Sequence, residues 1–398
     1  KEYPMTLAHG RQYLAIPGPS VVPDRVLQAM HRAAPNIYGG PLYDLTYSLI
    51  PDLKKIARTE SDVAIYIGNG HAAWEASLAN VLSRGDKVLV LATGLFGLGW
   101  AEVARGLRAE VEVIDFGVQS DVAVERLDFA LRADTEGRIK AVMVCHVDTS
   151  AGVRNDIPAI RKTMDAACHG ALLMVDCIAS LACDVYEMDA WGADVTVAAS
   201  QKGLMTPPGL GFVWFNEKAA KVHETADCAT GYWNWKPRAN PEGYWQLFGG
   251  TAPTHHLYGL RTAIDMIMEE GLENVWARHG KLARALWAAV EAWGQGGPMA
   301  FNITDPAKRS HAVSAFGIGA GNGDKLRGWC EEKAGLTLGI GLGREPADAY
   351  FRVGHMGHVN AQMILAAIAT IDAGLKATGI AHGAGAVEAA TALIAAEA

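Results

Sequence analysis

Residues 172–203 read LLMVDCIASLACDVYEMDAWGADVTVAASQKG. They hold two short apolar runs, 172–175 and 195–199, with Asp176 directly after the first run and Lys202 shortly after the second. Runs this short and this continuously apolar are typical of strands that are buried on both faces, as in a parallel sheet covered by helices. Asp176 and Lys202 are 26 residues apart, which is about one strand–helix–strand unit. The stretch therefore predicts successive buried strands with a charged side chain following each.

The same alternation begins at about residue 50. Five further apolar runs predict strands, at 62–67, 87–92, 110–114, 141–146 and 211–215. Helical periodicity occupies intervening segments, at 72–82, 99–106, 124–132 and 157–168. Apolar runs that alternate with helices are the pattern of a parallel sheet with helices on its faces. We expect an α/β protein with a doubly wound, mostly parallel seven-stranded sheet.

The pattern changes near residue 294. Helical periodicity runs over 257–268 and 272–293, and a glycine-rich stretch, 294–298, follows. Beyond it we expect a strand at 312–316, helices at 324–333 and 360–376, and a helical, alanine-rich tail from Gly383. These signals predict a large domain over 20–275 and a smaller C-terminal α+β domain over 276–398, which residues 1–19 join. Because Lys1 is not an initiating methionine, we expect a short leader to be missing.

Composition excludes several classes of protein. The 398 residues carry a formal charge of -8 and no cluster of Lys and Arg, which argues against nucleic-acid binding. No apolar stretch reaches the roughly 18 residues of a membrane span, so we expect a soluble protein without a membrane partner. The six cysteines form no C-x-x-C pair, which argues against a zinc site or a disulfide framework. A reducing, cytoplasmic setting and no metal are the expectation.

The first chemically loaded position is the segment 68–72, Gly-Asn-Gly-His-Ala, which follows a predicted strand and opens a helix. The start of a helix offers backbone N–H groups and a positive dipole end to an anion, so a phosphate would fit there. The segment also matches the dinucleotide fingerprint, but the next strand ends in Thr93-Gly94 without the acidic residue that a nicotinamide cofactor needs. An NAD-dependent dehydrogenase is thus a remote alternative, and a merely structural glycine turn is another.

Asp176 and Lys202 are the next two positions. A carboxylate at the end of a buried strand either caps a helix, pairs with a neighbouring loop, or faces a protonated ring nitrogen. Lys202 is either a solvated loop charge or an amine in a rigid setting, since Gly203 and the Pro-Pro-Gly turn at 207–209 follow it. A phosphate anchor, a ring-nitrogen partner and a Schiff-base amine are together the parts that pyridoxal 5'-phosphate requires.

Arg352 is the fourth position. It lies within the apolar, glycine-flanked segment Tyr-Phe-Arg-Val-Gly-His-Met-Gly, 350–357. The guanidinium fork suits a bidentate contact with a carboxylate, and a surface arginine at a strand edge is the plain alternative. Its place in the small domain would let domain closure deliver it over a cofactor.

Four stretches together resemble class V of the fold-type I pyridoxal-phosphate aminotransferases. They are SQKGLMTPPGLGF (200–212), MVDCIASL (174–181), GNGHAAWEASLANVL (68–82) and FRVGHMG (351–357). Within that family the chain is most similar to serine/alanine:glyoxylate aminotransferases. The resemblance covers nearly the whole chain, from the segment Ile-Pro-Gly-Pro-Ser at 16–20 through 338–343 to the terminal helices. It implies a PLP-dependent transaminase that moves an amino group from a small amino acid to a small 2-oxo acid, with glyoxylate giving glycine.

The resemblance also implies roles for individual residues. Lys202 would hold the cofactor and move the proton, while Asp176 would pair with the ring nitrogen and Arg352 would bind the substrate's α-carboxylate. The remaining matched positions contact the cofactor: Asn69, Gly70, His71 and Gln201 the phosphate; Phe96, Ser150 and Ile178 the ring; Phe248 and Thr251 the phosphate of a neighbouring subunit. A homodimer, or a tetramer built from it, is part of the implication.

The chain departs from the family at one loop, where Ile37-Tyr38-Gly39-Gly40-Pro41 replaces a commoner His-Arg-Ser-Pro. We therefore expect Tyr38 and Gly39 to shape the pocket that receives the donor's side chain. Serine, alanine and aspartate all stay open as donors. The chain also has Gly-Asn-Gly-His where Ser-Gly-Thr-Gly is commoner. Its polar Asn69-Gly70-His71 favours phosphate retention over the pyridoxamine:pyruvate type, which uses pyruvate and lacks the phosphate anchor.

Two further alternatives remain open. A PLP-dependent lyase or cysteine desulfurase needs a reactive cysteine on a mobile loop, whereas Cys330 lies in a segment that reads as a helix face. A catalytically silent binding protein of the same fold could lose Lys202 or Asp176, and both are present.

Overall fold

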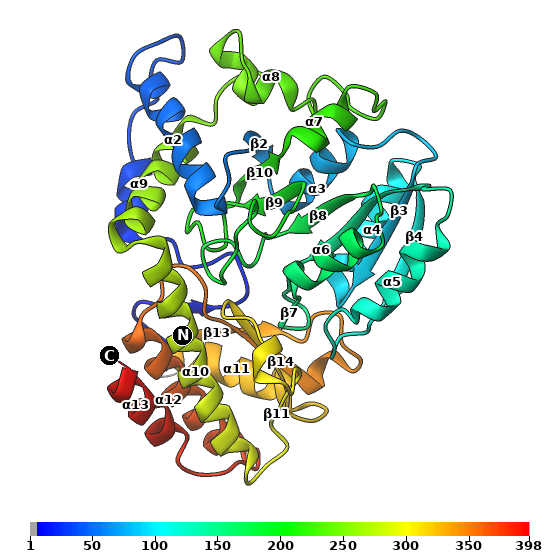
Figure 1. The fold of residues 1–398 in the computed structure, drawn as a ribbon. Helices are drawn as coiled ribbons and strands as arrows, with labels where there is room; N and C mark the ends of the chain where they lie inside the picture. The colour runs from blue at the N-terminus through cyan, green and yellow to red at the C-terminus, as the bar shows by residue number, and fades with distance from the viewer. Residues whose placement is uncertain (1–5, 398) are drawn as a thin grey trace.

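The computed structural model describes residues 6–397, so the expectation about Lys1 falls outside the described residues. Its main feature is a seven-stranded sheet (Figure 1), confirming the predicted α/β fold. Five strands form parallel pairs, and β10 runs antiparallel to both of its neighbours. In spatial order the strands are β2 (Asp62–Gly68), β10 (Gly209–Phe215), β9 (Val195–Ala199), β8 (Leu172–Asp176), β5 (Ile139–Cys145), β3 (Lys87–Ala92) and β4 (Glu110–Asp115).

The central strands are apolar throughout because helices cover both of their faces. In β8, Leu172 and Met174 pack on one side with the helices that follow β2 and β3, whereas Leu173 and Val175 pack on the other. The first face is covered by α3 (Gly70–Ala79), α4 (Leu95–Gly106), α7 (Glu217–His223) and residues near α8 (Lys236–Ala239). The second is covered by α2 (Pro41–Ala57), α5 (Val124–Ala133), α6 (Ile157–Ala166) and α9 (Thr254–Glu270). Alternate side chains of a strand therefore pack on opposite faces, and the sheet lies between two apolar layers.

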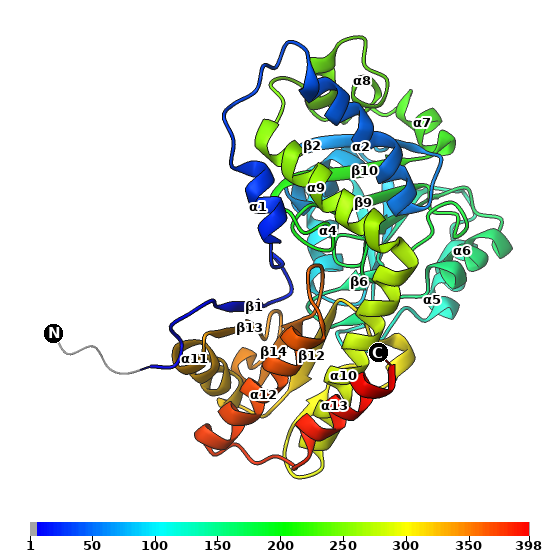
Figure 2. The same cartoon turned by 90° about the vertical axis from the view of Figure 1, so that its left-hand side faces the viewer.

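A second sheet has its own apolar core (Figure 2). Its strands, in spatial order, are β1 (Tyr13–Ala15), β13 (Leu336–Ile340), β14 (Tyr350–Gly354), β12 (Val313–Gly317) and β11 (Ala300–Phe301). Its helices are α11 (Asn322–Ala334), α12 (Ala361–Thr378) and α13 (Ala386–Glu397). A two-stranded ribbon, β6 (Val147–Asp148) and β7 (Val153–Arg154), completes the strands of the described residues, and short 3₁₀ turns lie at Tyr244–Phe248, Pro306–Lys308 and Ala347–Ala349.

The long helix α10 (Leu272–Gly294) connects the two cores. Leu272, Val275 and Trp276 pack into the core of the seven-stranded sheet, whereas Leu286, Val290 and Trp293 pack into the other core. A boundary at residues 275 and 276 stays a prediction. Within residues 6–397, no helix is both long and apolar enough to cross a membrane.

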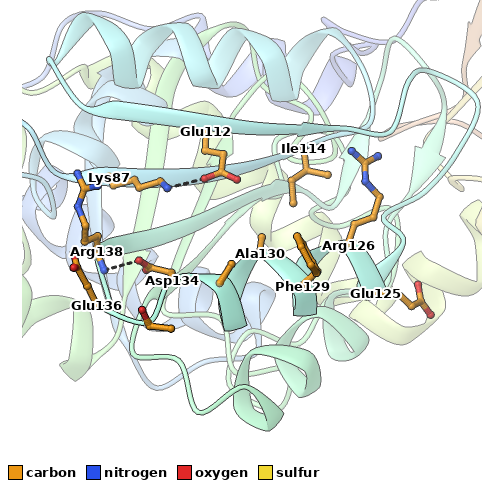
Figure 3. Close-up of a pocket in the computed structure, with 12 residues that line it drawn as sticks. Lys87, Glu112, Ile114, Glu125, Arg126, Phe129, Ala130, Asp134, Glu136 and Arg138 are labelled. Carbon is orange, nitrogen blue, oxygen red and sulfur yellow. Dashed lines mark hydrogen bonds and ion pairs between the residues drawn. The ribbon is translucent and has the colours of Figure 1, made fainter.

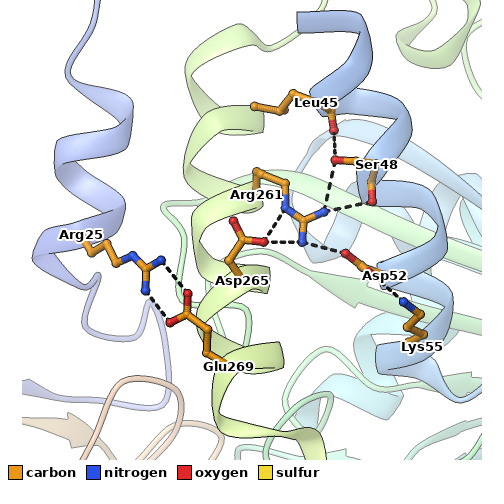
Figure 4. A network of polar contacts seen from close by, with 8 residues as sticks. All are labelled: Arg25, Leu45, Ser48, Asp52, Lys55, Arg261, Asp265 and Glu269. Carbon is orange, nitrogen blue, oxygen red and sulfur yellow. Dashed lines mark hydrogen bonds and ion pairs between the residues drawn. The ribbon is translucent and has the colours of Figure 1, made fainter. Parts of the chain in front are cut away.

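The N-terminal helices are tied to α9 by charged groups (Figure 4). Arg25, on α1 (Asp24–Met30), forms a bidentate pair with Glu269 at 2.6 and 2.7 Å. Arg261 donates to Asp52 of α2 at 2.8 Å and to Asp265 at 3.0 Å. The Arg261–Asp52 contact is mostly buried, so it fixes α2 against α9 more firmly than the exposed Arg25–Glu269 pair fixes α1.

Candidate active site

A cavity of about 200 Å³ lies at the carboxyl ends of β8 and β9, beside the start of α3. Ligands of open α/β sheets bind at this end of the strands. Eight predicted residues come together in its wall: Asn69, Gly70, His71, Phe96, Asp176, Ile178, Gln201 and Lys202. Four residues that the sequence did not single out complete it: Trp74, Val147, Thr149 and Ala179.

Asp176 ends β8 and is buried. The Trp74 indole Nε1–H donates to its Oδ2 at 2.9 Å, the Ile178 amide donates to Oδ1 at 2.7 Å, and the Cys145 thiol lies 3.6 Å from Oδ2. Burial raises the pKa of Asp176 to about 6, and the hydrogen bonds from Ile178 and Trp74 oppose that rise. Among the described residues no cationic side chain forms an ion pair with Asp176, so a cationic ring nitrogen is the kind of partner that this carboxylate suits.

Lys202 follows β9 and brings its amine to the same cavity. Burial and, to a smaller extent, the positive charge of Arg352 lower the pKa of Lys202 to about 8, and the charge of Asp176 opposes this fall. The amine donates to the backbone carbonyl of Pro17. A lysine with this pKa holds an appreciable fraction of neutral, nucleophilic amine near neutral pH.

The start of α3 differs from the expectation in one respect. The Asn69 side chain is the N-cap and accepts hydrogen bonds from the His71 and Ala72 amides at 3.1 and 3.4 Å, so those two N–H groups are not free. The positive end of the helix still faces the cavity through Asn69, Gly70 and His71. The side-chain Oε1 of Gln201 is buried without a partner in the described residues. The positive end of a helix in this wall fits a phosphate group, and Gln201 would contact the phosphate through its Nε2–H donors, because its Oε1 only accepts hydrogen bonds.

The walls between Asp176 and Lys202 are apolar. Ile178 packs so closely on Gly70 that a Cβ at position 70 would come within 2.5 Å of its Cδ1. Phe96 lies edge-on to Trp74, with ring centroids 6.2 Å apart. Such walls suit the faces of a flat heteroaromatic ring.

Ser150 supports the site and does not line it. Its hydroxyl donates to Asp148 at 2.6 Å and accepts from the Leu95 amide at 2.8 Å. Asp148 also accepts from the Phe96 and Gly97 amides, at 2.9 and 3.1 Å, and so holds the first turn of α4. Burial raises the pKa of Asp148, and these hydrogen bonds oppose the rise. The sequence did not reveal Asp148, because the α4 amides that donate to it are more than fifty residues away along the chain.

Arg352 lies on β14 and contacts both the neighbouring strand β13 and the turn between β6 and β7. Its Nε donates to the Ile340 carbonyl at 2.7 Å and its Nη1 to the Thr149 carbonyl at 2.9 Å. Burial lowers the pKa of Arg352 to about 10. The guanidinium does not line the cavity. It lies at the edge of the site, because Thr149, whose carbonyl it contacts, is part of the cavity wall.

The other predicted residues lie away from the cavity in the single chain. The Phe248 side chain is fully buried in the core of its own chain, so its ring cannot face a partner, whereas Thr251 is exposed. Tyr38 is 87% exposed and, like Gly39, is not part of the cavity wall. The role of Tyr38 and Gly39 in shaping the donor pocket stays a prediction.

A more open cavity of about 680 Å³ lies against the edge strand β4 and helix α5 (Figure 3). Its wall contains the Lys87–Glu112 ion pair at 2.7 Å and the exposed ring of Phe129. The polar groups of this ion pair satisfy each other, and no cysteine, serine or histidine lines the cavity. The chemistry is therefore placed in the smaller cavity.

A lysine of lowered pKa, a buried carboxylate, a helix start and apolar walls thus enclose one space. These residues fit pyridoxal 5'-phosphate: Asp176 would pair with the ring nitrogen, Lys202 would bond to the aldehyde carbon, and Asn69, Gly70, His71 and Gln201 would hold the phosphate. The fold and the site together define the class of fold-type I aminotransferases.

Comparison with known proteins agrees with this class. Residues 12–353 match the family Aminotransferase class-V. The chain is 38% identical over 383 residues to the serine–glyoxylate aminotransferase of Methylorubrum extorquens, covering 93% of each chain. It is 34% identical to the L-aspartate–glyoxylate aminotransferase of Paracoccus denitrificans, covering 90% of this chain and 89% of that one. The chain belongs to the class-V aminotransferase family and is an aminotransferase.

The solved structures agree on the fold. The crystal structure of pyridoxamine–pyruvate aminotransferase from Mesorhizobium loti matches with a TM-score of 0.89 at 26% sequence identity, covering 100% of both chains. The match includes both sheets, so the smaller five-stranded sheet is part of the shared fold.

Proposed function

We propose that the chain binds pyridoxal 5'-phosphate in the 200 Å³ cavity and transfers the amino group of a small amino acid to glyoxylate, which gives glycine. The observation that carries the proposal is that Asp176 and Lys202 line one cavity. Burial raises the pKa of Asp176 and lowers that of Lys202 there. Perturbed groups of opposite kinds in one cleft are typical of catalytic sites. The names of the relatives support glyoxylate as the acceptor.

The cofactor, when bound, supplies an electron sink that acidifies the substrate's Cα–H bond. Lys202 Nζ, with a pKa of about 8, is the base that takes this proton and returns it. Asp176 keeps the ring nitrogen protonated, because a buried carboxylate gains a partner only when that nitrogen carries a charge. Arg352 binds the substrate's carboxylate. Binding there would use Arg352 N–H groups beyond the two that donate to Ile340 and Thr149.

Serine, alanine and aspartate are the proposed donors. The serine–glyoxylate and aspartate–glyoxylate relatives support the first and last of them. Pyruvate is the alternative acceptor, supported by the structural match to the pyridoxamine–pyruvate enzyme. A cysteine desulfurase is not favoured. Cys330 is buried on α11, and burial raises the pKa of its thiol to about 12, so it is a poor nucleophile.

We further propose a cytoplasmic homodimer, with a tetramer as the larger form. Three exposed aromatic residues support a partner surface near the N-terminal loop and the turn at 244–248: Tyr38, Tyr47 and Trp245. Thr251 is exposed nearby in the sequence and is the proposed contact with the partner's cofactor. Tyr38 and Gly39 would then shape the donor pocket of the partner subunit.

The test is a panel of single half-reactions on the holoenzyme. Each donor is mixed with the enzyme in the absence of acceptor, and the loss of the visible absorbance of the lysine-bound cofactor is followed. Serine, alanine or aspartate should convert the cofactor to its amine form, and glyoxylate should then restore the original spectrum with formation of glycine. Restoration by pyruvate alone would select the alternative acceptor, and no conversion with any donor would refute transamination.

A further inference from the structure

Residues 16–20, Ile-Pro-Gly-Pro-Ser, form a segment that we call the strap. It leaves β1 in the five-stranded sheet and leads toward α1 beside the seven-stranded sheet (Figure 2). The strap therefore passes from one sheet to the other at the level of the cavity. The function proposed above gives it no role.

The strap packs closely on the smaller sheet. A Cβ at position 354 would overlap the carbonyl oxygen of Ile16, and a Cβ at position 339 would lie 2.8 Å from the Pro17 ring. Only glycine at 339 and 354 leaves room for the strap backbone on β13 and β14. Position 354 is two residues from Arg352, so the strap packs on the strand that carries the proposed carboxylate-binding residue.

The strap also holds the loop that carries Lys202. The Ser20 amide donates to the Gln201 carbonyl at 2.8 Å, and the Ser20 hydroxyl donates to the Lys202 carbonyl at 2.7 Å. The Pro17 carbonyl accepts from the Lys202 amine. Both ends of Lys202, its backbone and its amine, are thus bound to a five-residue segment anchored on the other sheet.

Gly18 leaves the space that the amine occupies. A Cβ at this position would overlap Lys202 Nζ and lie 2.6 Å from both Cδ and Cε. The backbone φ of Gly18 is +97°, in the region that favours glycine. Any side chain at position 18 would push the amine off the Pro17 carbonyl.

We propose that the strap is a positioning element for the catalytic lysine, and that the Pro17 carbonyl holds the Lys202 amine whenever that amine is not bonded to the cofactor. The inference rests on the proposed function. Transamination frees the lysine from the cofactor in the donor half-reaction and bonds it to the cofactor again at the end of the acceptor half-reaction. In between, the freed amine must stay within reach to move a proton. A fixed acceptor keeps the amine there and away from the amino group of pyridoxamine phosphate, whose like charge would repel it.

The two cofactor forms should depend differently on the contact between Pro17 and the Lys202 amine. Pyridoxamine phosphate binds without a bond to lysine and therefore needs the amine at Pro17, whereas pyridoxal phosphate takes the amine into a covalent bond. Gly18→Ala should raise the Kd of the apo-protein for pyridoxamine phosphate about tenfold more than its Kd for pyridoxal phosphate. This ratio corresponds to one charge-assisted hydrogen bond, at about 1.4 kcal/mol per factor of ten.

Gly85→Ala is the matched control. Gly85 has φ +88°, so alanine is strained there as it is at position 18, but a Cβ at position 85 would have no other atom within 4 Å. Both variants carry a similar backbone strain, and Gly18→Ala adds the overlap with Lys202, so only Gly18→Ala should change the ratio of the two Kd values. Ser20→Ala, which removes the hydroxyl bond to the Lys202 carbonyl without backbone strain, should change the ratio in the same direction by less.

Equal effects of Gly18→Ala on both Kd values, or no change beyond that of Gly85→Ala, would overturn the proposal. If Gly18→Ala fails to fold, an unchanged ratio in Ser20→Ala would overturn it. Failure of the wild-type protein to bind either cofactor form would instead refute the proposed function.

Discussion

The hydrogen bond from the Trp74 indole to Asp176 sets the protonation of the proposed ring-nitrogen partner. Trp74→Phe removes the donor, which lies 2.9 Å from Oδ2, and keeps an aromatic ring in the cavity wall. A hydrogen bond to a charged group contributes about 1.5–3 kcal/mol, and one pKa unit corresponds to about 1.4 kcal/mol. Because the donor stabilises the charged carboxylate, its loss should raise the pKa of Asp176 by roughly 1–2 units from its value of about 6.

The assay is a carbon-detected NMR titration of the apo-protein, with the Asp176 carboxyl signal assigned by its disappearance in Asp176→Asn. Other groups act on this carboxyl: Asp148 raises its pKa, and the Cys145 thiol lowers it. Both are unchanged in Trp74→Phe. The titration is made without cofactor, because a charged ring nitrogen beside Asp176 would itself lower the pKa of this carboxyl.

Trp100→Phe is the matched control. Trp100 is buried and stacks on Trp74 with ring centroids 6.2 Å apart, and its Nε1 has no hydrogen-bond partner among the described residues. The Trp100→Phe substitution removes the same atoms from the same core but removes no hydrogen bond to Asp176. If Trp100→Phe raised the pKa of Asp176 as much as Trp74→Phe does, packing and not the hydrogen bond would be responsible, and the reasoning would be refuted.

Asp176→Asn should lower the half-reaction rate by orders of magnitude, because an unprotonated ring is a weaker electron sink; a near-normal rate by stopped-flow absorbance would make Asp176 only structural. Arg352→Lys keeps the charge but loses the fork, so steady-state kinetics should show a similar fall in kcat/KM for every donor. Gly39→Ser should instead change the ranking of donors by filling the proposed side-chain pocket, and an unchanged ranking would remove Gly39 from that role.

The strands and the two charged residues were predictable because they depend on local pattern. In the strand Leu172–Asp176 every residue before the aspartate is apolar, which indicates that both faces of the strand are buried. Parallel strands also bring their carboxyl ends to one edge of the sheet. Asp176 and Lys202 do line one cavity, and their catalytic roles stay a prediction. It also predicted the helical tail, which the structure has as α13.

Contacts between distant segments were not predictable. The helix predicted from residue 99 begins at Leu95, because Asp148 caps a turn whose glycines read as a loop. The Trp74–Asp176 bond joins residues 102 apart in the chain, and the Pro17–Lys202 contact joins residues 185 apart. Neither contact produces a periodic pattern in the sequence. The motif at 16–20 was therefore visible in the sequence, but its contact with Lys202 was not.

The most direct test of the account is to find which residue carries the cofactor. The protein is loaded with pyridoxal 5'-phosphate, reduced with borohydride, digested and mapped by mass spectrometry. We expect the pyridoxyl group on Lys202, and we expect no labelling of a Lys202→Ala variant that folds like the wild type. Labelling of any other lysine, or of none, would contradict the site.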